Sequence, residues 1–150
     1  MAEICERVSE LYELVDKELL LCGALLHDIG KIKEDPTKGF IDFTDEGRLL
    51  GHIVLGDEFI TEKIKKIEDF PKELALKLRH LILSHQGDLK LASPVVPQTI
   101  EAAILHCADE MDSQAGAFTQ IIKKQKTPGK KWSDWIKLID RYIYMGSAEE

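Results

Sequence analysis

The sequence predicts an all-α fold of about six or seven helices, and three observations support this prediction. Apolar residues recur at helical spacing along most of the 150 residues. Outside the loops, no run alternates apolar and polar residues over the length of a strand. No internal repeat or low-complexity segment breaks the pattern. With 44% hydrophobic residues the chain can bury one core, so we expect a single domain.

Two helices are predicted before residue 30. The first carries apolar residues at i, i+4, i+7, i+8 and i+11, namely Ile4, Val8, Leu11, Tyr12 and Val15. The second, from Lys17 to His27, is almost uniformly apolar, so we expect it at the centre of the core. Gly30 ends this helix, and the broken pattern of residues 32–43 predicts a loop.

Two long helices are predicted next. Thr44 is a good N-cap for a third helix that runs to about Ile67. Pro71 suits the first position of a fourth helix, which ends near Gly87. The segment 88–97 contains two prolines and is expected to be a loop.

The C-terminal part is predicted to contain the last two helices. A fifth long helix begins at Thr99 and reaches Phe118 or, in a longer form, Lys126. Pro128 and Gly129 break it, and Ser133 is the predicted cap of a short final helix that Gly146 closes.

Charge and cysteine usage restrict the class of protein. A net charge of −7 argues against wrapping nucleic acid by bulk charge, so any phosphate recognition must be local. The locally basic stretches are Lys63–Lys66 and Lys123–Lys131, the second next to Trp132 and Trp135. These stretches are either solvated helix ends or a surface that contacts the phosphates of a nucleic acid, with the tryptophans stacking on its bases.

We expect a soluble, cytoplasmic protein without membrane contact. The three cysteines are isolated and odd in number, so they form no disulfide framework. Apolar runs such as Leu19–Leu26 are far shorter than a bilayer span, and the acidic N-terminus lacks the features of a signal peptide.

All five histidines lie in apolar helical stretches, at His27, His52, His80, His85 and His106. A single such histidine is more often a hydrogen-bonded core residue, but five favour a metal site. On a continuing helix His27 and Asp28 would point about 100° apart, so they converge on one ion only where the helix ends. Imidazole with carboxylate suits Mn, Fe, Co or Zn at a catalytic site, and a carboxylate such as Asp28 can bridge two ions.

The remaining candidate metal ligands differ in their spacing along the helices. Asp109 interrupts an apolar stretch and needs a cation, for which a metal and Lys31 are both candidates. His80 and His85 lie about 140° apart on a helix, so His85, nearer the helix end, is the better ligand. His80 is then a further ligand, a hydrogen-bond donor to a ligand or a substrate contact, and His106 reads as a packed neighbour.

The doublet His27-Asp28 in LLHDIGK and the later Asp109 in HCAD resemble the HD superfamily of metal-dependent phosphohydrolases. The segments TDEGRLLGHIVLGDEFI and LRHLILSHQGDLKLASPVVPQTIEAAILHCADEMDS resemble the HD domain of YhaM-type 3′-to-5′ exoribonucleases. SHQGD and CADEMD are also similar to the HD domain of RNase Y, an endoribonuclease. The resemblance runs from near residue 1 to about residue 120.

The resemblance implies one HD domain over residues 1–150, with a helical core at about 4–120 and a helical extension at about 121–146. It implies phosphodiester hydrolysis with one or two divalent ions (Mn, Fe, Co, Ni or Zn) and single-stranded RNA or a nucleotide as substrate. The implied catalytic residues are Asp28 and Lys31. The implied metal ligands are His27, Asp28, His52, His80, His85 and Asp109.

Two departures from the family pattern leave alternatives open. The pattern opens with a histidine upstream of the doublet, and this sequence has none before His27, which indicates a shortened chain or a degenerate site. Gln86 stands where a second histidine is common, and we expect this chain to lack the N-terminal OB-fold module of YhaM-type proteins. The alternatives are a nucleotidase or cyclic-nucleotide phosphodiesterase, and a non-catalytic HD module that binds RNA or a partner.

Overall fold

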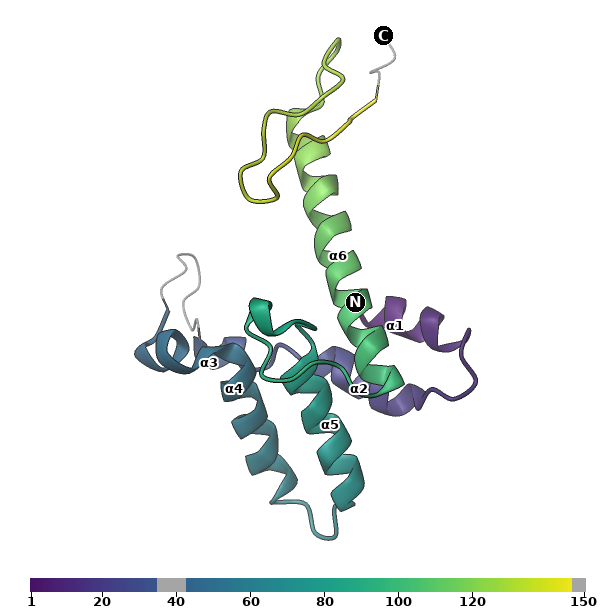
Figure 1. The fold of residues 1–150 in the computed structure, drawn as a ribbon, viewed down its shortest axis with the longest axis vertical. Helices are drawn as coiled ribbons and strands as arrows, with labels where there is room; N and C mark the ends of the chain where they lie inside the picture. The colour runs from purple at the N-terminus through teal and green to yellow at the C-terminus, as the bar shows by residue number, and fades with distance from the viewer. Residues whose placement is uncertain (35–42, 147–150) are drawn as a thin grey trace. The chain divides into compact units, whose positions relative to one another are not determined.

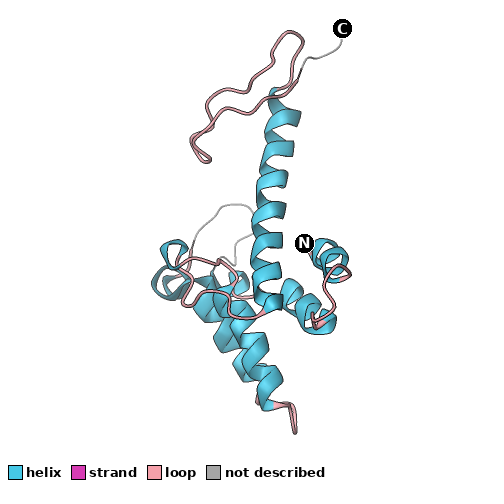
Figure 2. Cartoon of the chain, turned by 45° about the vertical axis from the view of Figure 1, so that its right-hand side comes forward, coloured by secondary structure: helices cyan, strands magenta, loops and turns pink. Residues whose placement is uncertain are grey.

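The computed structural model describes residues 1–34 and 43–146, and this part of the chain is helical (Figures 1 and 2). Its elements are α1 (Ala2–Ser9), α2 (Lys17–Leu26), α3 (Lys31–Glu34), α4 (Asp45–Ile64), α5 (Lys72–Ser84), the 3-10 helix η1 (Leu89–Leu91) and α6 (Ile100–Gln125). Five of these helices have eight residues or more, so the expected six or seven is slightly too high. No helix in the described ranges is both long and apolar enough to cross a bilayer.

The chain divides into two compact units, Met1–Asp109 and Glu110–Glu150. In the first unit α2 packs against α1 and α5, and α4 packs against α3 and α5 (Figure 1). Burial of this core removes apolar surface from water and supplies most of the driving force for folding. The core consists of Cys5, Leu19, Leu20, Ala24, Ile60, Leu78, Leu81, Ile82, Ala102, Leu105 and Ala108.

The first helix is shorter than predicted, since it ends at Ser9 and Val15 lies outside it. Asp16 must adopt an extended conformation (φ −75°, ψ 94°) to cap α2, where its side chain accepts a hydrogen bond from the Leu19 amide. That cap prevents one continuous helix. The intervening residues form turns, and Leu11 is 76% exposed. The prediction of α2 itself is confirmed to within one residue.

The predicted N-cap of α4 is confirmed, because Thr44 Oγ1 accepts a hydrogen bond from the Gly47 amide at 2.9 Å. The helix ends at Ile64, earlier than the expected Ile67. The predicted loop at 32–43 is wrong at its start, where α3 forms, and residues 35–42 of that prediction lie outside the described residues. An unpredicted kink divides α4 at Gly51, which has φ 74° and ψ 157°.

The predictions for α5 and α6 agree with the structure in extent. Helix α5 begins at Lys72, and Pro71 stands at the N-cap, one position before the place predicted for it. It ends at Ser84, shortly before Gly87, near which the sequence predicted its end. Helix α6 follows the longer of the two predicted forms and reaches Gln125.

The predicted final helix, capped by Ser133 and closed by Gly146, is wrong. Isolated antiparallel bridges join Trp132 to Tyr144 and Ile136 to Arg141, so the segment folds as a hairpin-like loop. Aromatic and β-branched residues dominate it and favour extended backbone. Ser133 accepts a hydrogen bond from the Ile143 amide across the loop instead of capping a helix.

Candidate metal centre

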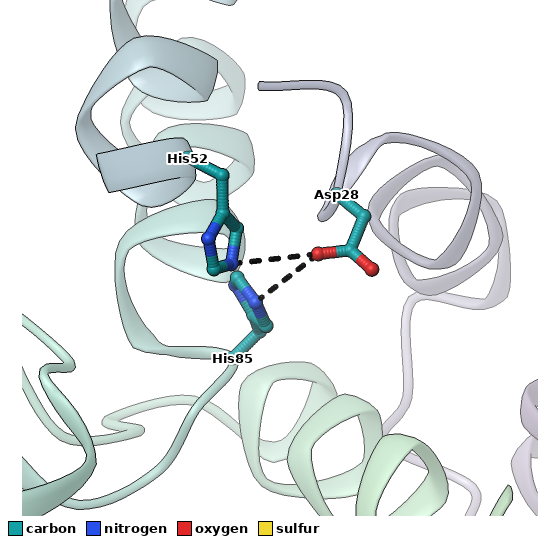
Figure 3. A group of neighbouring side chains, drawn as sticks. All are labelled: Asp28, His52 and His85. Atoms are coloured by element: carbon teal, nitrogen blue, oxygen red, sulfur yellow. Dashed lines mark ion pairs between the residues drawn. The ribbon is translucent and has the colours of Figure 1, made fainter. Parts of the chain in front are cut away.

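In the first unit the Asp28 carboxylate faces His52 and His85 (Figure 3), and these residues together with His27, Lys31 and Asp109 form the Asp28 cluster. The Asp28 Oδ1 atom is 3.5 Å from His52 Nε2 and 3.8 Å from His85 Nε2. One donor atom from each of these residues lies within 4.8 Å of the other two. A carboxylate oxygen and two imidazole nitrogens therefore converge on one point from three separate elements.

The second oxygen of Asp28 faces another set of groups. Asp28 Oδ2 is 3.4 Å from His27 Nε2 and 2.6 Å from Lys31 Nζ. His27 Nε2 is in turn 3.7 Å from Asp109 Oδ1. The carboxylate thus separates two groups of donors, His52 with His85 on one side and His27 with Asp109 on the other. Among the described residues, the donor set close enough to share one ion is Asp28, His52 and His85.

Two of the histidines are oriented by the helix that each one follows. His27 stands at the C-cap of α2 and His85 at the C-cap of α5. His27 Nδ1 lies 3.0 Å from the Ala24 carbonyl oxygen, and His85 Nδ1 lies 2.7 Å from that of Ile82. A carbonyl oxygen only accepts, so each Nδ1 carries a proton and donates it. In the neutral ring the lone pair is then on Nε2, which faces Asp28.

His52 reaches the cluster because two glycines shape its surroundings. Gly51, at positive φ, breaks α4 immediately before His52 and sets the direction of the residue that follows. A Cβ atom on Gly30 would lie 1.9 Å from the His52 carbonyl oxygen and 2.6 Å from the Gly56 amide nitrogen. Gly30 thus lets the turn after Asp28 touch the backbone of α4, a role beyond the helix stop that the sequence predicted.

Glu34 is a neighbour of the cluster that sequence reasoning missed. Its Oε2 atom lies 3.5 Å from His52 Nδ1, and its side chain is largely buried. The Glu34 backbone oxygen also accepts a hydrogen bond from the Thr44 amide at 3.0 Å, which fixes α3 against the start of α4. A carboxylate behind a histidine holds the ring orientation and tautomer. The sequence pattern placed Glu34 in a loop, where no spacing indicated this contact.

The cluster shifts the pKa values of its members. Burial disfavours the charged form of His27, but the Asp109 and Asp28 carboxylates outweigh it and raise the pKa of His27 to about 9. Burial raises the pKa of Asp28, yet His27 and Lys31 hold it well below its usual range. His27 also lowers the pKa of Asp109, whereas burial lowers the pKa of His85. Without metal, positive charge on His27 and Lys31 therefore compensates the two carboxylates.

Two histidines predicted from the sequence have other partners. His80 Nε2 accepts a hydrogen bond from the Gln98 amide at 2.9 Å, so the structure does not bring it to Asp28. His106 Nδ1 lies 3.0 Å from the His85 carbonyl oxygen and packs beside Gly87, in keeping with its reading as a packed neighbour. The sequence offered either a metal or Lys31 as the cation that neutralises Asp109. In the structure Lys31 pairs with Asp28 instead.

The cluster meets the requirements of a divalent cation. Asp28 Oδ1 and His52 Nε2 are buried and have no hydrogen-bond partner among the described residues. Leaving buried polar atoms unpaired costs about 1–3 kcal/mol each, and a cation between them would remove that cost. The donors are imidazole nitrogens and carboxylate oxygens without a thiolate, which suits a catalytic site better than a structural zinc site.

Comparison with known proteins places the chain among HD-domain proteins. A family model described as the HD domain matches residues 1–114. The 3'-5' exoribonuclease YhaM of Bacillus subtilis is 36% identical over 146 residues, which cover 96% of this chain and 45% of that protein. YhaM of Shouchella clausii is 36% identical over 149 residues, covering 98% and 46%, and YhaM of Listeria monocytogenes is 35% identical over 152 residues, covering 99% and 47%. The chain spans about half the length of these curated relatives. No solved structure matches it.

Proposed function

Because the chain belongs to the HD-domain family, we propose that the Asp28 cluster is a divalent-metal centre that hydrolyses phosphodiester bonds at the 3′ end of single-stranded RNA. The observation that carries the proposal is the pair of buried, unpartnered atoms Asp28 Oδ1 and His52 Nε2, 3.5 Å apart. Polar atoms that are buried without a partner point to a missing ligand.

The ligands fall into two groups in this proposal. Asp28, His52 and His85 would hold one ion. Asp28, His27 and Asp109 would contribute to a second. We leave His80 out of both groups, because its Nε2 is used by a backbone amide. The donor set is compatible with Mn, Fe, Co, Ni or Zn.

The chain's own residues would perform three tasks in the reaction. The Ala24 and Ile82 carbonyls hold the rings of His27 and His85 with Nε2 directed toward Asp28. Lys31, whose side chain is 55% exposed, neutralises Asp28 until a cation takes that role, and its ammonium can then contact a phosphate oxygen. When bound, divalent ions supply a water of near-neutral pKa and neutralise charge on the phosphate.

The choice of substrate rests on the relatives. They are named 3'-5' exoribonucleases, and residues of this chain align with them over 96% or more of its length in the three comparisons above. Since the chain spans about half of each relative, RNA as substrate and exonucleolytic direction belong to the proposal. A cytoplasmic location, which the isolated cysteines favoured, belongs to it as well.

A pair of matched histidine variants tests the metal centre. His52→Gln and His80→Gln both alter half-buried histidines of the first unit, but only His52 faces Asp28. After reconstitution with Mn, we expect His52→Gln to lose bound metal, measured by elemental analysis, and His80→Gln to retain it. Equal metal content in the two variants would show that the site lies elsewhere.

Activity is then measured with Mn and a 5′-labelled single-stranded RNA. We expect a ladder of products that shortens from the 3′ end and requires both metal and His52. Hydrolysis confined to mononucleotides or cyclic nucleotides would replace the exoribonuclease proposal with a nucleotidase one. A metal-loaded protein without hydrolysis of any of these substrates would indicate a binding module.

A further inference from the structure

We propose that the hairpin-like loop of the second unit is a binding surface for single-stranded RNA, built from a ladder of four aromatic side chains among basic residues. The proposal rests on the proposed function only for the choice of RNA as the polyanion. The four aromatics are Trp132, Trp135, Tyr142 and Tyr144.

The bridge register places all four aromatics on one face. Trp132 lies opposite Tyr144, and Tyr142 and Tyr144 share a face because they are two residues apart on one strand. Between the two bridges, the segment from Trp132 to Ile136 is one residue longer than the segment from Arg141 to Tyr144 that pairs with it. Such an extra residue on one side is a β-bulge. The extra residue shifts the alternation, so Trp135 points to the same side as Tyr142.

Ring contacts agree with this register. The Trp132 and Tyr144 ring centroids are 5.0 Å apart with an interplanar angle of 61°, and those of Trp135 and Tyr142 are 5.0 Å apart at 71°. Edge-to-face pairs of this kind hold each other in place. On the opposite face Ser133, Ile143 and Met145 are buried, which anchors the loop.

The four aromatic side chains of this face are exposed to solvent although they are large. Trp132 is 54% exposed, Trp135 49%, Tyr142 56% and Tyr144 56%. A protein does not need four large exposed rings on one short loop for its own folding. Rings held in place and left accessible are the platform on which unpaired bases stack.

The charge around the loop is opposite to that of the whole chain. Between residues 123 and 146 there are seven lysines and arginines against two aspartates, although the chain carries a net charge of −7. Lys131 and Arg141 directly precede Trp132 and Tyr142, so strand alternation directs their side chains away from the ring face, and both cations are exposed. A local excess of cations on the same loop as the rings favours a flexible polyanion with accessible bases, which describes single-stranded RNA better than a duplex.

The two tryptophans of the chain, Trp132 and Trp135, both lie on this surface, so intrinsic fluorescence reports on it directly. The full chain is titrated in EDTA, which prevents metal-dependent cleavage, with single-stranded RNA of about 15 nucleotides, a length that fits such sites. We expect quenching that saturates. A duplex of the same sequence and inorganic polyphosphate should each quench much less.

Matched variants separate stacking from folding. Trp132→Ala should weaken RNA binding about fivefold or more, and Trp132→Phe should restore most of it. Tyr12→Ala, which removes another half-exposed aromatic, should leave affinity unchanged. Lys131→Gln should reduce the salt dependence of binding, whereas Lys65→Gln should not.

The proposal is overturned if single-stranded RNA does not quench, if duplex or polyphosphate quenches equally, or if anionic lipid vesicles bind in preference to RNA. It is also overturned if Trp132→Ala binds as tightly as the unchanged chain. Because binding is measured without metal, failure here leaves RNA hydrolysis untouched, and binding without hydrolysis would refute only the proposed function.

Discussion

Replacing Gly30 by alanine tests whether close backbone contact builds the metal centre. A Cβ atom at this position would lie 1.9 Å from the His52 carbonyl oxygen, whereas real Cβ contacts essentially never fall below 3.0 Å. The obstructing atoms are backbone, so no side-chain rotation relieves the clash. The turn after Asp28 and helix α4 must therefore separate by about 1 Å, a displacement that loosens a preorganised site.

The size of the effect follows from this geometry. Overpacking of this kind costs about 1–3 kcal/mol, so we expect Gly30→Ala to lower the Tm by roughly 2–12 °C. Because the displaced backbone atom belongs to His52, we also expect metal affinity to fall by about tenfold or more. Thermal unfolding monitored by circular dichroism and competition with a metal-sensitive chelator dye measure the two quantities.

Gly116→Ala is the matched control. A Cβ atom at Gly116 meets nothing within 4 Å, and the residue is exposed within α6. Alanine favours a helix over glycine by about 1 kcal/mol, so this variant should be as stable as the unchanged chain or more so. Unchanged Tm and metal affinity in Gly30→Ala would refute the inferred contact between the turn and α4.

Two further predictions concern the neighbours of the ligands. Glu34→Ala should weaken metal binding about 10- to 100-fold, with Glu34→Gln intermediate, and the His52 ring should lose its preferred tautomer in ¹⁵N NMR spectra; unchanged affinity would exclude an orienting role. In the metal-free protein the pKa of His27 is raised to about 9 from an ordinary 6.5, so its stabilising charge is complete below pH 6.5 and is lost as the pH rises through 9. Chemical denaturation in EDTA should therefore show stability falling over that range, and a flat profile, or one equal to that of His27→Gln, would contradict the assignment.

Much of the cluster could be predicted from the sequence because its chemistry is carried by residue type. Histidine and aspartate in apolar surroundings need partners, and this requirement is visible without coordinates. The prediction that His85 is better placed than His80 also depended on local geometry alone, since a helix end can be read from Gly87. The structure places His85, but not His80, beside Asp28.

The predictions that failed depended on contacts between distant segments. The segment after Ser133 has apolar residues compatible with a helix, but pairing of Trp132 with Tyr144 decides its conformation. Intrinsic propensity is a weak prior that tertiary pairing overrides. The first helix also ends earlier than its periodicity indicated, and there the Asp16 amide donates a hydrogen bond to the distant Glu101 Oε1 at 2.9 Å.

By itself the sequence predicted the helical class, the central position of α2 and most of the histidines and carboxylates that meet around Asp28, because these depend on residue type and short-range spacing. Only the tertiary structure decided which oxygen of Asp28 faces which histidine, that Glu34 stands behind His52, and that Gly30 is a point of close approach. Each of these is a contact between the segment that follows α2 and another element, either α4 or the end of α5. Sequence periodicity carries no information about the distance between separate elements. Likewise, only the register of the loop brings Trp132 and Trp135 to one surface with Tyr142 and Tyr144.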